Sequence, residues 1–181
     1  MNKSEMIAQC AQLAMLLEVS APTKPGNVDR FHEYPDTRFE HFVASAVGVY
    51  PVLKRASLSR RGVGTLIKEA VLQSMRWHDC GNTHFGTFLL LIPLSMAAGE
   101  VLEMGKLEKR GATLVLRDTA QRIVRSTDVL DALEFYEAFR VARVKVKSVP
   151  SLDLRDEETA KEAFKKASAK LPIKTKFVKR Q

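Results

Sequence analysis

The sequence predicts an all-α fold: a single helical domain with a buried central apolar helix. Along the 181-residue chain, apolar residues recur at spacings of three and four, the pattern of amphipathic helices. Leu, Ala and Val dominate the apolar content, and no alternating pattern persists long enough for a sheet. The uncharged segment 85–98 has the length of a core helix. It is shorter than the roughly 20 residues of a membrane span, so we expect no membrane contact.

The first helix is predicted to begin at a Ser4 cap and to end before Ala21, because Pro22 pushes the preceding residue out of helical geometry. Its apolar residues at helical spacing are expected to face the core, and they are Met6, Cys10, Leu13, Ala14 and Leu17. On this interpretation Cys10 is a buried free thiol.

Two further helices should follow a loop rich in proline and glycine over residues 20–36. The second is expected to start after a cap at Asp36 or Thr37 and to kink at Pro51. The third follows the glycines at 62–64 and is predicted to end at Gly81 as a left-handed C-cap.

The remaining elements complete one domain with a distinct end. Asn82 or Thr83 is expected to cap the central apolar helix, which Pro93 should bend and which ends near Met104. A short helix over 119–125 and a longer one over 127–143 should follow, and 156–170 resembles a polar helix. We therefore predict a nucleotide-binding helical domain over residues 1–156 and a basic helix and tail over 157–181.

The formal charge of +8 comes from the end of the chain. Residues 161–181 carry eight basic side chains and one acid, which leaves 21 basic and 20 acidic side chains before them. A nucleic-acid partner is therefore not expected for the body, and binding through the tail is the weaker alternative. Two distant cysteines and a polar N-terminus without signal-peptide layout predict a cytoplasmic protein.

The loop from Pro22 to Arg30 is the first candidate site. Its prolines stiffen the backbone, and Gly26 lets the backbone approach a ligand closely. Lys24 offers a compact positive charge for phosphate, and Asp29 can hold a cation or accept a proton. A rigid turn with solvated charges is the alternative interpretation.

The second candidate site is the start of the central helix. Helix N-termini leave backbone N–H groups unpaired and bind anions readily. Asn82 and Thr83 add side-chain donors, and Gly86 leaves room for a ligand. His84 lies between them, although a lone histidine here is more often structural. A well-capped core helix explains the same residues.

Three acids complete the candidates. Asp36 and Glu40 are four residues apart, so on one helix they could share a magnesium ion, although a solvated face explains them nearly as well. Glu69 lies among apolar neighbours, which suggests partial burial.

Three motifs in this order resemble the triphosphoribosyl-dephospho-CoA synthase family, especially its archaeal-type branch. They are Pro-Thr-Lys-Pro-Gly-Asn-Val-Asp at 22–29, Phe-Val-Ala-Ser-Ala at 42–46 and Gly-Asn-Thr-His-Phe-Gly-Thr at 81–87. The resemblance extends to about Asp156, so the chain is expected to lack the family's C-terminal part. Apolar faces left uncovered would make a homodimer one way to hide them.

The resemblance implies an all-helical enzyme that joins ATP to dephospho-CoA and releases adenine. It implies that nucleotide and phosphate bind at Lys24, Gly26, Asn27, Asn82, Thr83, His84 and Gly86. Magnesium would be held by Asp36 and Glu40, and Asp29 and Glu69 are the candidate catalytic acids or bases. Residues 31–37 depart from the Gly-Ala-His and Asp-Met signature of bacterial members, so another nucleotide acceptor stays open. A shortened, non-catalytic relative that binds a nucleotide or a partner protein is the main alternative.

Overall fold

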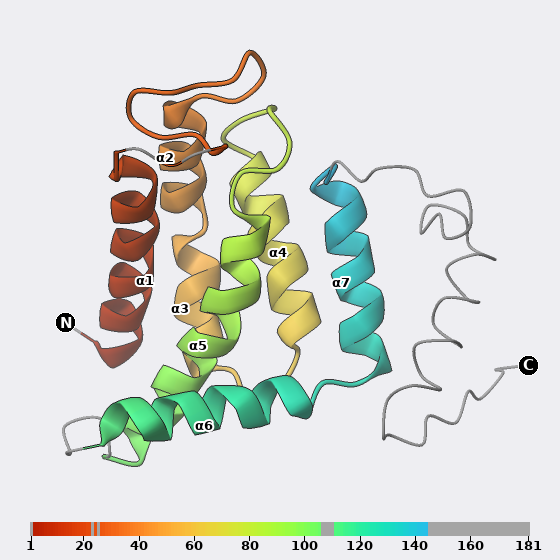
Figure 1. The fold of residues 1–181 in the computed structure, drawn as a ribbon. Helices are drawn as coiled ribbons and strands as arrows, with labels where there is room; N and C mark the ends of the chain where they lie inside the picture. Colours follow the sequence, from red (N-terminus) through yellow and green to blue (C-terminus); the bar gives the residue numbers. More distant parts are fainter. Residues whose placement is uncertain (1, 23, 25, 106–110, 145–181) are drawn as a thin grey trace, which may run out of the picture. The chain divides into compact units, whose positions relative to one another are not determined.

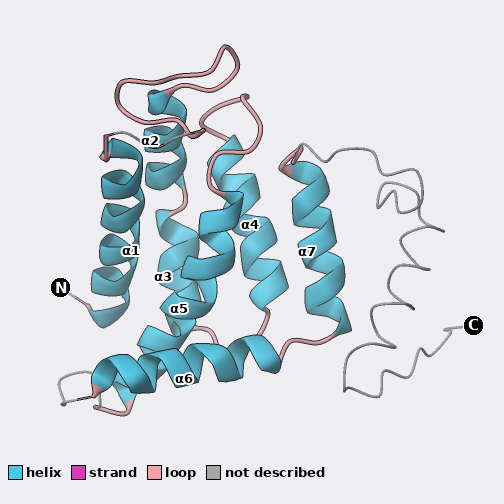
Figure 2. Cartoon of the chain, viewed as in Figure 1, coloured by secondary structure: helices cyan, strands magenta, loops and turns pink. Residues whose placement is uncertain are grey.

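The computed structural model describes residues 2–22, 24, 26–105 and 111–144 (Figure 1). Within these ranges the chain forms seven α-helices and no β-strand (Figure 2), which confirms the predicted all-α class. The helices are α1 (Lys3–Ser20), α2 (Phe39–Gly48), α3 (Tyr50–Leu58), α4 (Val63–Met75), α5 (Phe85–Glu103), α6 (Ala112–Arg125) and α7 (Val129–Val141). They belong to one compact unit that ends at Val144. The predicted boundary at 156 and the helix over 156–170 lie outside the described residues.

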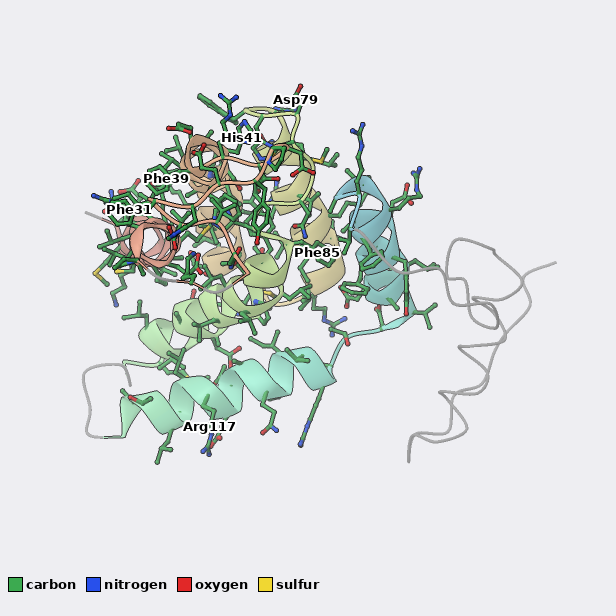
Figure 3. All side chains as sticks on the ribbon, turned by 45° about the horizontal axis from the view of Figure 1, so that its top comes forward. Phe31, Phe39, His41, Asp79, Phe85 and Arg117 are labelled. Atoms are coloured by element: carbon green, nitrogen blue, oxygen red, sulfur yellow. The ribbon has the colours of Figure 1, made fainter. Side chains whose placement is uncertain are left out.

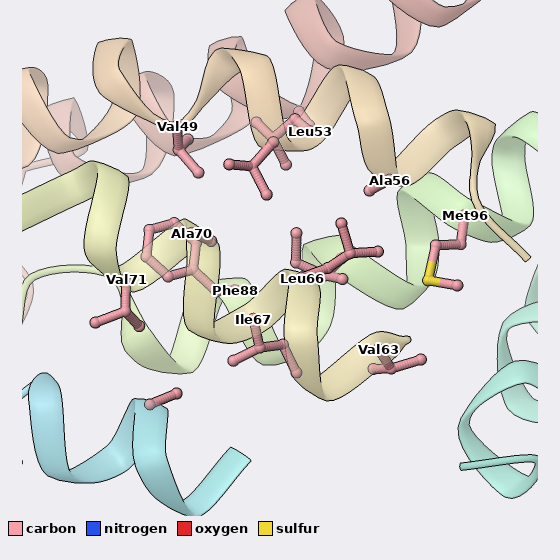
Figure 4. Close-up of a cluster of buried hydrophobic side chains, with 14 of the residues drawn as sticks. Val49, Leu53, Ala56, Val63, Leu66, Ile67, Ala70, Val71, Phe88 and Met96 are labelled. Atoms are coloured by element: carbon pink, nitrogen blue, oxygen red, sulfur yellow. The ribbon is translucent and has the colours of Figure 1, made fainter. Parts of the chain in front are cut away.

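Helix α5 is the centre of this unit, as the sequence predicts. It packs against α1, α3, α4 and α6, while α7 packs on the other side of α4. Phe88, Ile92 and Met96 of α5 are fully buried among side chains of α3 and α4 (Figure 4). Burial of each such side chain stabilises the fold by about 1.5–3 kcal/mol.

By length and composition α5 could also cross a membrane, since its 19 residues exceed the 14-residue apolar run considered above. However, 56% of its most apolar window is buried against the other helices. The core helix of a soluble protein satisfies the same criteria. Pro93 lies inside α5 and is itself buried.

The sequence predicts the wrong face of α1 as the buried one. The residues that face the core are Ser4, Ile7, Ala8, Ala11, Met15 and Val19. The predicted stripe is on the other side, where Cys10 is exposed and Leu13 and Leu17 are 54% and 62% exposed. Both faces of this helix are apolar, so periodicity could not distinguish them.

Several helix ends also differ from the expectations. Asn2, not Ser4, caps α1, and its side chain accepts the Ser4 N–H. Helix α2 starts at Phe39, whose N–H is accepted by the Glu33 carboxylate, so neither Asp36 nor Thr37 caps it. Instead of a kink at Pro51, the chain divides into two helices, α2 and α3, at Val49. Pro51 then lies near the start of α3, where a proline is well tolerated.

The bounds of α4, α6 and α7 also differ from the predicted ones. Helix α4 ends at Met75, so Gly81 lies in the following loop, although its φ of 86° is left-handed as expected. Helix α6 is longer than the predicted 119–125 and begins at Ala112. Asp128 caps α7 through a capping box with Asp131.

Two glycines allow helices to approach closely. A Cβ atom on Gly99 of α5 would collide with the carbonyl group of Ser57 in α3, and one on Gly64 of α4 would collide with the backbone of Asp131 in α7. In both cases the obstacle is backbone, which cannot rotate away. These contacts fix how closely α3 approaches α5 and α4 approaches α7.

We therefore predict that Gly99→Ala lowers the free energy of unfolding by about 1–3 kcal/mol or more, as overpacking of a core does. Gly86→Ala is the matched control, because a Cβ there meets no atom within 4 Å. It should leave stability unchanged or slightly raised. Urea denaturation followed by circular dichroism checks both, and equal stability of the two variants would contradict the close approach.

Candidate functional site

Two loops meet at one end of the helices. One joins α1 to α2 over residues 21–38, and the other joins α4 to α5 over 76–84. Figure 1 shows both at the top of the view, and Figure 3 turns this end forward and labels Phe31, Phe39, His41 and Asp79 there. The first loop and the α5 start are the two segments that the sequence singled out.

Asp29 organises the first loop. Its side chain is fully buried and accepts hydrogen bonds from the backbone N–H groups of Lys24, Phe31 and His32 at 2.8–3.1 Å. The His32 imidazole adds a contact of 2.9 Å from Nδ1. The Phe31 N–H is the largest cause that lowers the pKa of Asp29 far below its usual value, even though burial opposes this. Asp29 is thus held as an anion that fixes the loop backbone.

Lys24 extends from this loop and is only 17% exposed at its side chain. Its Nζ donates to the Glu18 carboxylate of α1 at 2.8 Å. Its charge also contributes to lowering the pKa of His84, which places it within electrostatic reach of the α5 start. Gly26 has a left-handed φ of 75°, and Asn27 caps the following residue, its Oδ1 accepting the Val28 N–H. The loop therefore needs both residues for its shape.

A buried group of hydroxyls joins the second loop to the helices. Ser45 of α2 lies 2.6 Å from Ser74 of α4, measured between the Oγ atoms. Thr83 donates to Ser45 at 3.0 Å, and Nδ1 of His84 lies 2.9 Å from the same Ser45 oxygen. Ser74 is also 3.1 Å from Nε2 of His78. Two helices, the loop and the residue that precedes α5 thus share one hydrogen-bond network.

His84 has an unusual position in that network. It is 2% exposed, and its ring packs edge-on against Phe42 with 4.9 Å between centroids. Burial is the main cause that lowers the pKa of His84 to about 3, with smaller contributions from the charges of His78 and Lys24. Its Nε2 is buried without a hydrogen-bond partner among the described residues. A buried orphan of this kind calls for an explanation, and a ligand that bonds to it is one.

His78 connects the network to an exposed rim. Its Nδ1 lies 3.3 Å from the Cys80 thiol, and its ring is 5.9 Å from that of His41 between centroids. Burial lowers the pKa of His78, and burial raises the pKa of Cys80, to which the charges of Asp79 and Asp36 add. Both groups are therefore kept neutral at pH 7.

The first turn of α5 offers unpaired donors. The N-cap position of α5 is His84, so neither of the two predicted residues occupies it. The Asn82 Oδ1 nevertheless accepts the Phe85 N–H at 3.1 Å, while the hydroxyl of Thr83 turns to Ser45. Within the described part of the chain, the N–H groups of Gly86 and Thr87 have no acceptor. Gly86 is exposed with open space beside it. Free N–H groups and the helix dipole together favour an anion.

A small hollow lies beside this turn, lined by residues of α4, α5, the loop between them and Ala142. It contains about 160 Å³ of space not filled by atoms, part of it open solvent. A hollow this small and open does not enclose a nucleotide.

The predicted acids are distributed differently from the other candidates. Glu69 pairs with Arg55 of α3. On α4, Glu69 lies five residues before Ser74, which is about 7.5 Å along the helix axis. Asp36 lies in a turn before α2, so it does not share a helix with Glu40 and the i, i+4 argument fails. The described residues contain no group of three or more metal-ligating side chains. Asp36, Glu40 and Asp79 are exposed acids of this end.

Sequence reasoning missed most of the hydroxyl network. Ser45, Ser74 and His78 were not singled out as site residues, because each is one polar residue on or next to an otherwise apolar helix. The available signal was Ser45 within the motif at 42–46 and Ser74 among inward-facing apolar positions. A polar residue at a core position needs a partner, which is reason enough to consider it.

The fold and the geometry define an all-helical protein whose central helix starts with acceptor-free N–H groups, within electrostatic reach of a loop lysine. The chain belongs to the ATP:dephospho-CoA triphosphoribosyl transferase (CitG) family, whose family model matches residues 4–172. Neither the curated proteins nor the solved structures include a significant match to the chain. The match confirms the family that the three motifs indicate.

The burial of His84 predicts a pH dependence of stability. Its folded pKa of about 3 lies below the ordinary histidine value of 6.5, so the unfolded chain binds a proton that the folded protein does not. Stability is therefore lost as pH falls below 6.5, by about 2 kcal/mol at pH 5. The lowered pKa of His78 acts in the same direction, whereas the lowered pKa of Asp29 matters only below 3.8.

Thermal unfolding between pH 7 and pH 5 checks this. His84→Asn removes the titrating group, so this variant should lose about 2 kcal/mol less than the wild type over the same range. Gln9→Asn is the control, because Gln9 is exposed and carries no titrating group, and it should keep the wild-type slope. Parallel pH curves for wild type and His84→Asn would contradict a buried neutral His84.

Proposed function

We propose that the protein is a nucleotide-dependent transferase that moves the triphosphoribosyl group of ATP to a nucleotide acceptor. The observation that carries this proposal is the first turn of α5, where the N–H groups of Gly86 and Thr87 have no acceptor among the described residues. Lys24 lies within electrostatic reach of His84, the residue before this turn. Family membership supports the substrates ATP and dephospho-CoA. The triphosphate would bind between Lys24 and the first turn of α5, where charge-assisted hydrogen bonds are strong.

The reaction displaces adenine from the anomeric carbon of ATP. The bond from that carbon to the adenine nitrogen breaks, and a bond to the acceptor's ribose 2′-hydroxyl oxygen forms. The hydroxyl proton passes to a base, and adenine leaves with the electron pair of the broken bond and takes up one proton, so the step releases no net proton. The protein's part is to hold the triphosphate and to orient the two riboses.

His84 and Asp29 have different parts in this proposal. The orphan Nε2 of His84 would hydrogen-bond to the bound substrate, since a neutral imidazole offers one donor or acceptor there. Asp29 fits a positioning role for Lys24 better than that of a base, because four contacts already hold its carboxylate. Glu69 pairs with Arg55, so it fits the base less well than an exposed acid such as Asp79 does.

Magnesium is a proposed cofactor that arrives with ATP. Mg²⁺ is usually bound by one or two carboxylates together with substrate phosphates and waters. Asp36 and Glu40 are exposed and fit this mode, in which the phosphates complete the ligand set. Bound magnesium would neutralise charge on the triphosphate.

Calorimetric titration of Mg-ATP tests the phosphate site. Lys24→Ala and Asn82→Ala should each weaken binding about 10- to 100-fold, the loss expected for a hydrogen bond to a charged group. Lys54→Ala is the matched control, because Lys54 pairs with Glu5 at the same 2.8 Å as Lys24 pairs with Glu18. Unchanged affinity in both site variants would remove the assignment.

Release of adenine tests the reaction. Wild-type protein with Mg-ATP should release adenine only when dephospho-CoA is added, which chromatography measures directly. ATP binding without release would favour another acceptor, or the non-catalytic alternative if a panel of nucleotide acceptors also fails. Asp29→Asn should reduce turnover through weaker ATP binding, so saturating ATP should restore most of it.

A further inference from the structure

The outward face of α1 lacks charge. Residues 6–17 contain no Asp, Glu, Lys or Arg, and the charged side chains of the helix are Lys3 and Glu5 at one end and Glu18 at the other. Cys10, Leu13 and Leu17 are exposed on the side opposite the core. A surface helix of a soluble protein normally has a polar outer face, and one that is apolar all round is normally covered on both sides.

The spacing on this face is that of a coiled-coil seam. Met6, Cys10, Leu13 and Leu17 are separated by four, three and four residues, which is the alternation of the a and d positions of a heptad. That order reads the same in both directions. Two copies of α1 packed antiparallel about a twofold axis would therefore place Met6 of each copy against Leu17 of the other. Cys10 of each copy would lie against Leu13 of the other.

The charged ends agree with the same arrangement. Lys3 and Glu18 lie at opposite ends of α1, on the same flank of the apolar seam when the helix is viewed down its axis. Antiparallel packing brings the Lys3 end of one helix beside the Glu18 end of the other. A parallel pair would instead leave Glu18 without a cation at its own level, because both Lys3 side chains would lie at the other end.

We infer that the outward face of α1 is the interface of a homodimer, in which two α1 helices pack antiparallel along the seam of Met6, Cys10, Leu13 and Leu17. A second copy is the occupant because the seam is complementary to itself in spacing and in charge, as a twofold interface requires. This inference does not rest on the proposed function, since the seam lies on the side of α1 that faces away from the core.

Sedimentation velocity of the full chain tests the inference. The wild type should sediment at twice the 20.3 kDa chain mass at micromolar concentrations. Leu13→Glu with Leu17→Glu places like charges across the seam and should weaken the dimer at least 100-fold. The matched control is Leu114→Glu with Leu133→Glu, whose exposures of 56% and 63% are close to the 54% and 62% of the seam pair. The control should remain a dimer.

Disulfide cross-linking tests the orientation. Leu13→Cys should give a covalent dimer under mild oxidation, because the thiol introduced at position 13 of one copy faces Cys10 of the other. Leu17→Cys should not, because position 17 faces Met6. Circular dichroism confirms that each variant is folded. A monomeric wild type, equal dissociation of the seam and control variants, or a photo-cross-linker at position 13 that captures residues 145–181 of its own chain would overturn the inference.

Discussion

The Ser45 hydroxyl is the point on which the candidate site depends. It contacts Ser74 of α4, Thr83 of the loop and His84 before α5. Because these groups are buried, each needs a partner, and an unpaired one costs about 1–3 kcal/mol. The start of α5 can therefore occupy only the position in which the network closes. His84 is held there with Nε2 unpaired among the described residues, and the free N–H groups of the first turn lie beside it.

The helices could largely be predicted from the sequence, because the proline, glycine and apolar patterns mark their limits. What failed is the direction of burial in α1 and the details of the caps. A helix with two apolar faces gives no local signal for which face meets the core, since the answer depends on the α3 and α5 surfaces packed against it. The prediction of the α2 cap failed for a similar reason, because the Glu33 carboxylate that accepts the Phe39 N–H comes from across a turn.

The candidate site was predictable in its loops and less so in its chemistry. Lys24 and Asn82 stand in motifs with unusual local composition, and the structure brings their two loops to one end. The roles of the acids depend on partners that residue type alone does not reveal. Asp29 accepts backbone N–H groups two and three residues further along its own loop, and Glu69 pairs with Arg55 of α3. A titratable residue identified by type alone therefore needs its partners before it can be given a role.

The inferred dimer face and the proposed phosphate site share one residue. Glu18 lies near the end of α1, where it pairs with Lys24, and in the antiparallel pair it also lies beside the Lys3 end of the second copy. Two cations at one carboxylate repel each other, so each is bound there less favourably than it would be alone. Dimerisation would thus loosen Lys24 from Glu18 and leave more of its charge for a triphosphate. Conversely, a phosphate that takes Lys24 frees Glu18 for the partner's lysine, so by linkage ATP binding and dimerisation would favour each other.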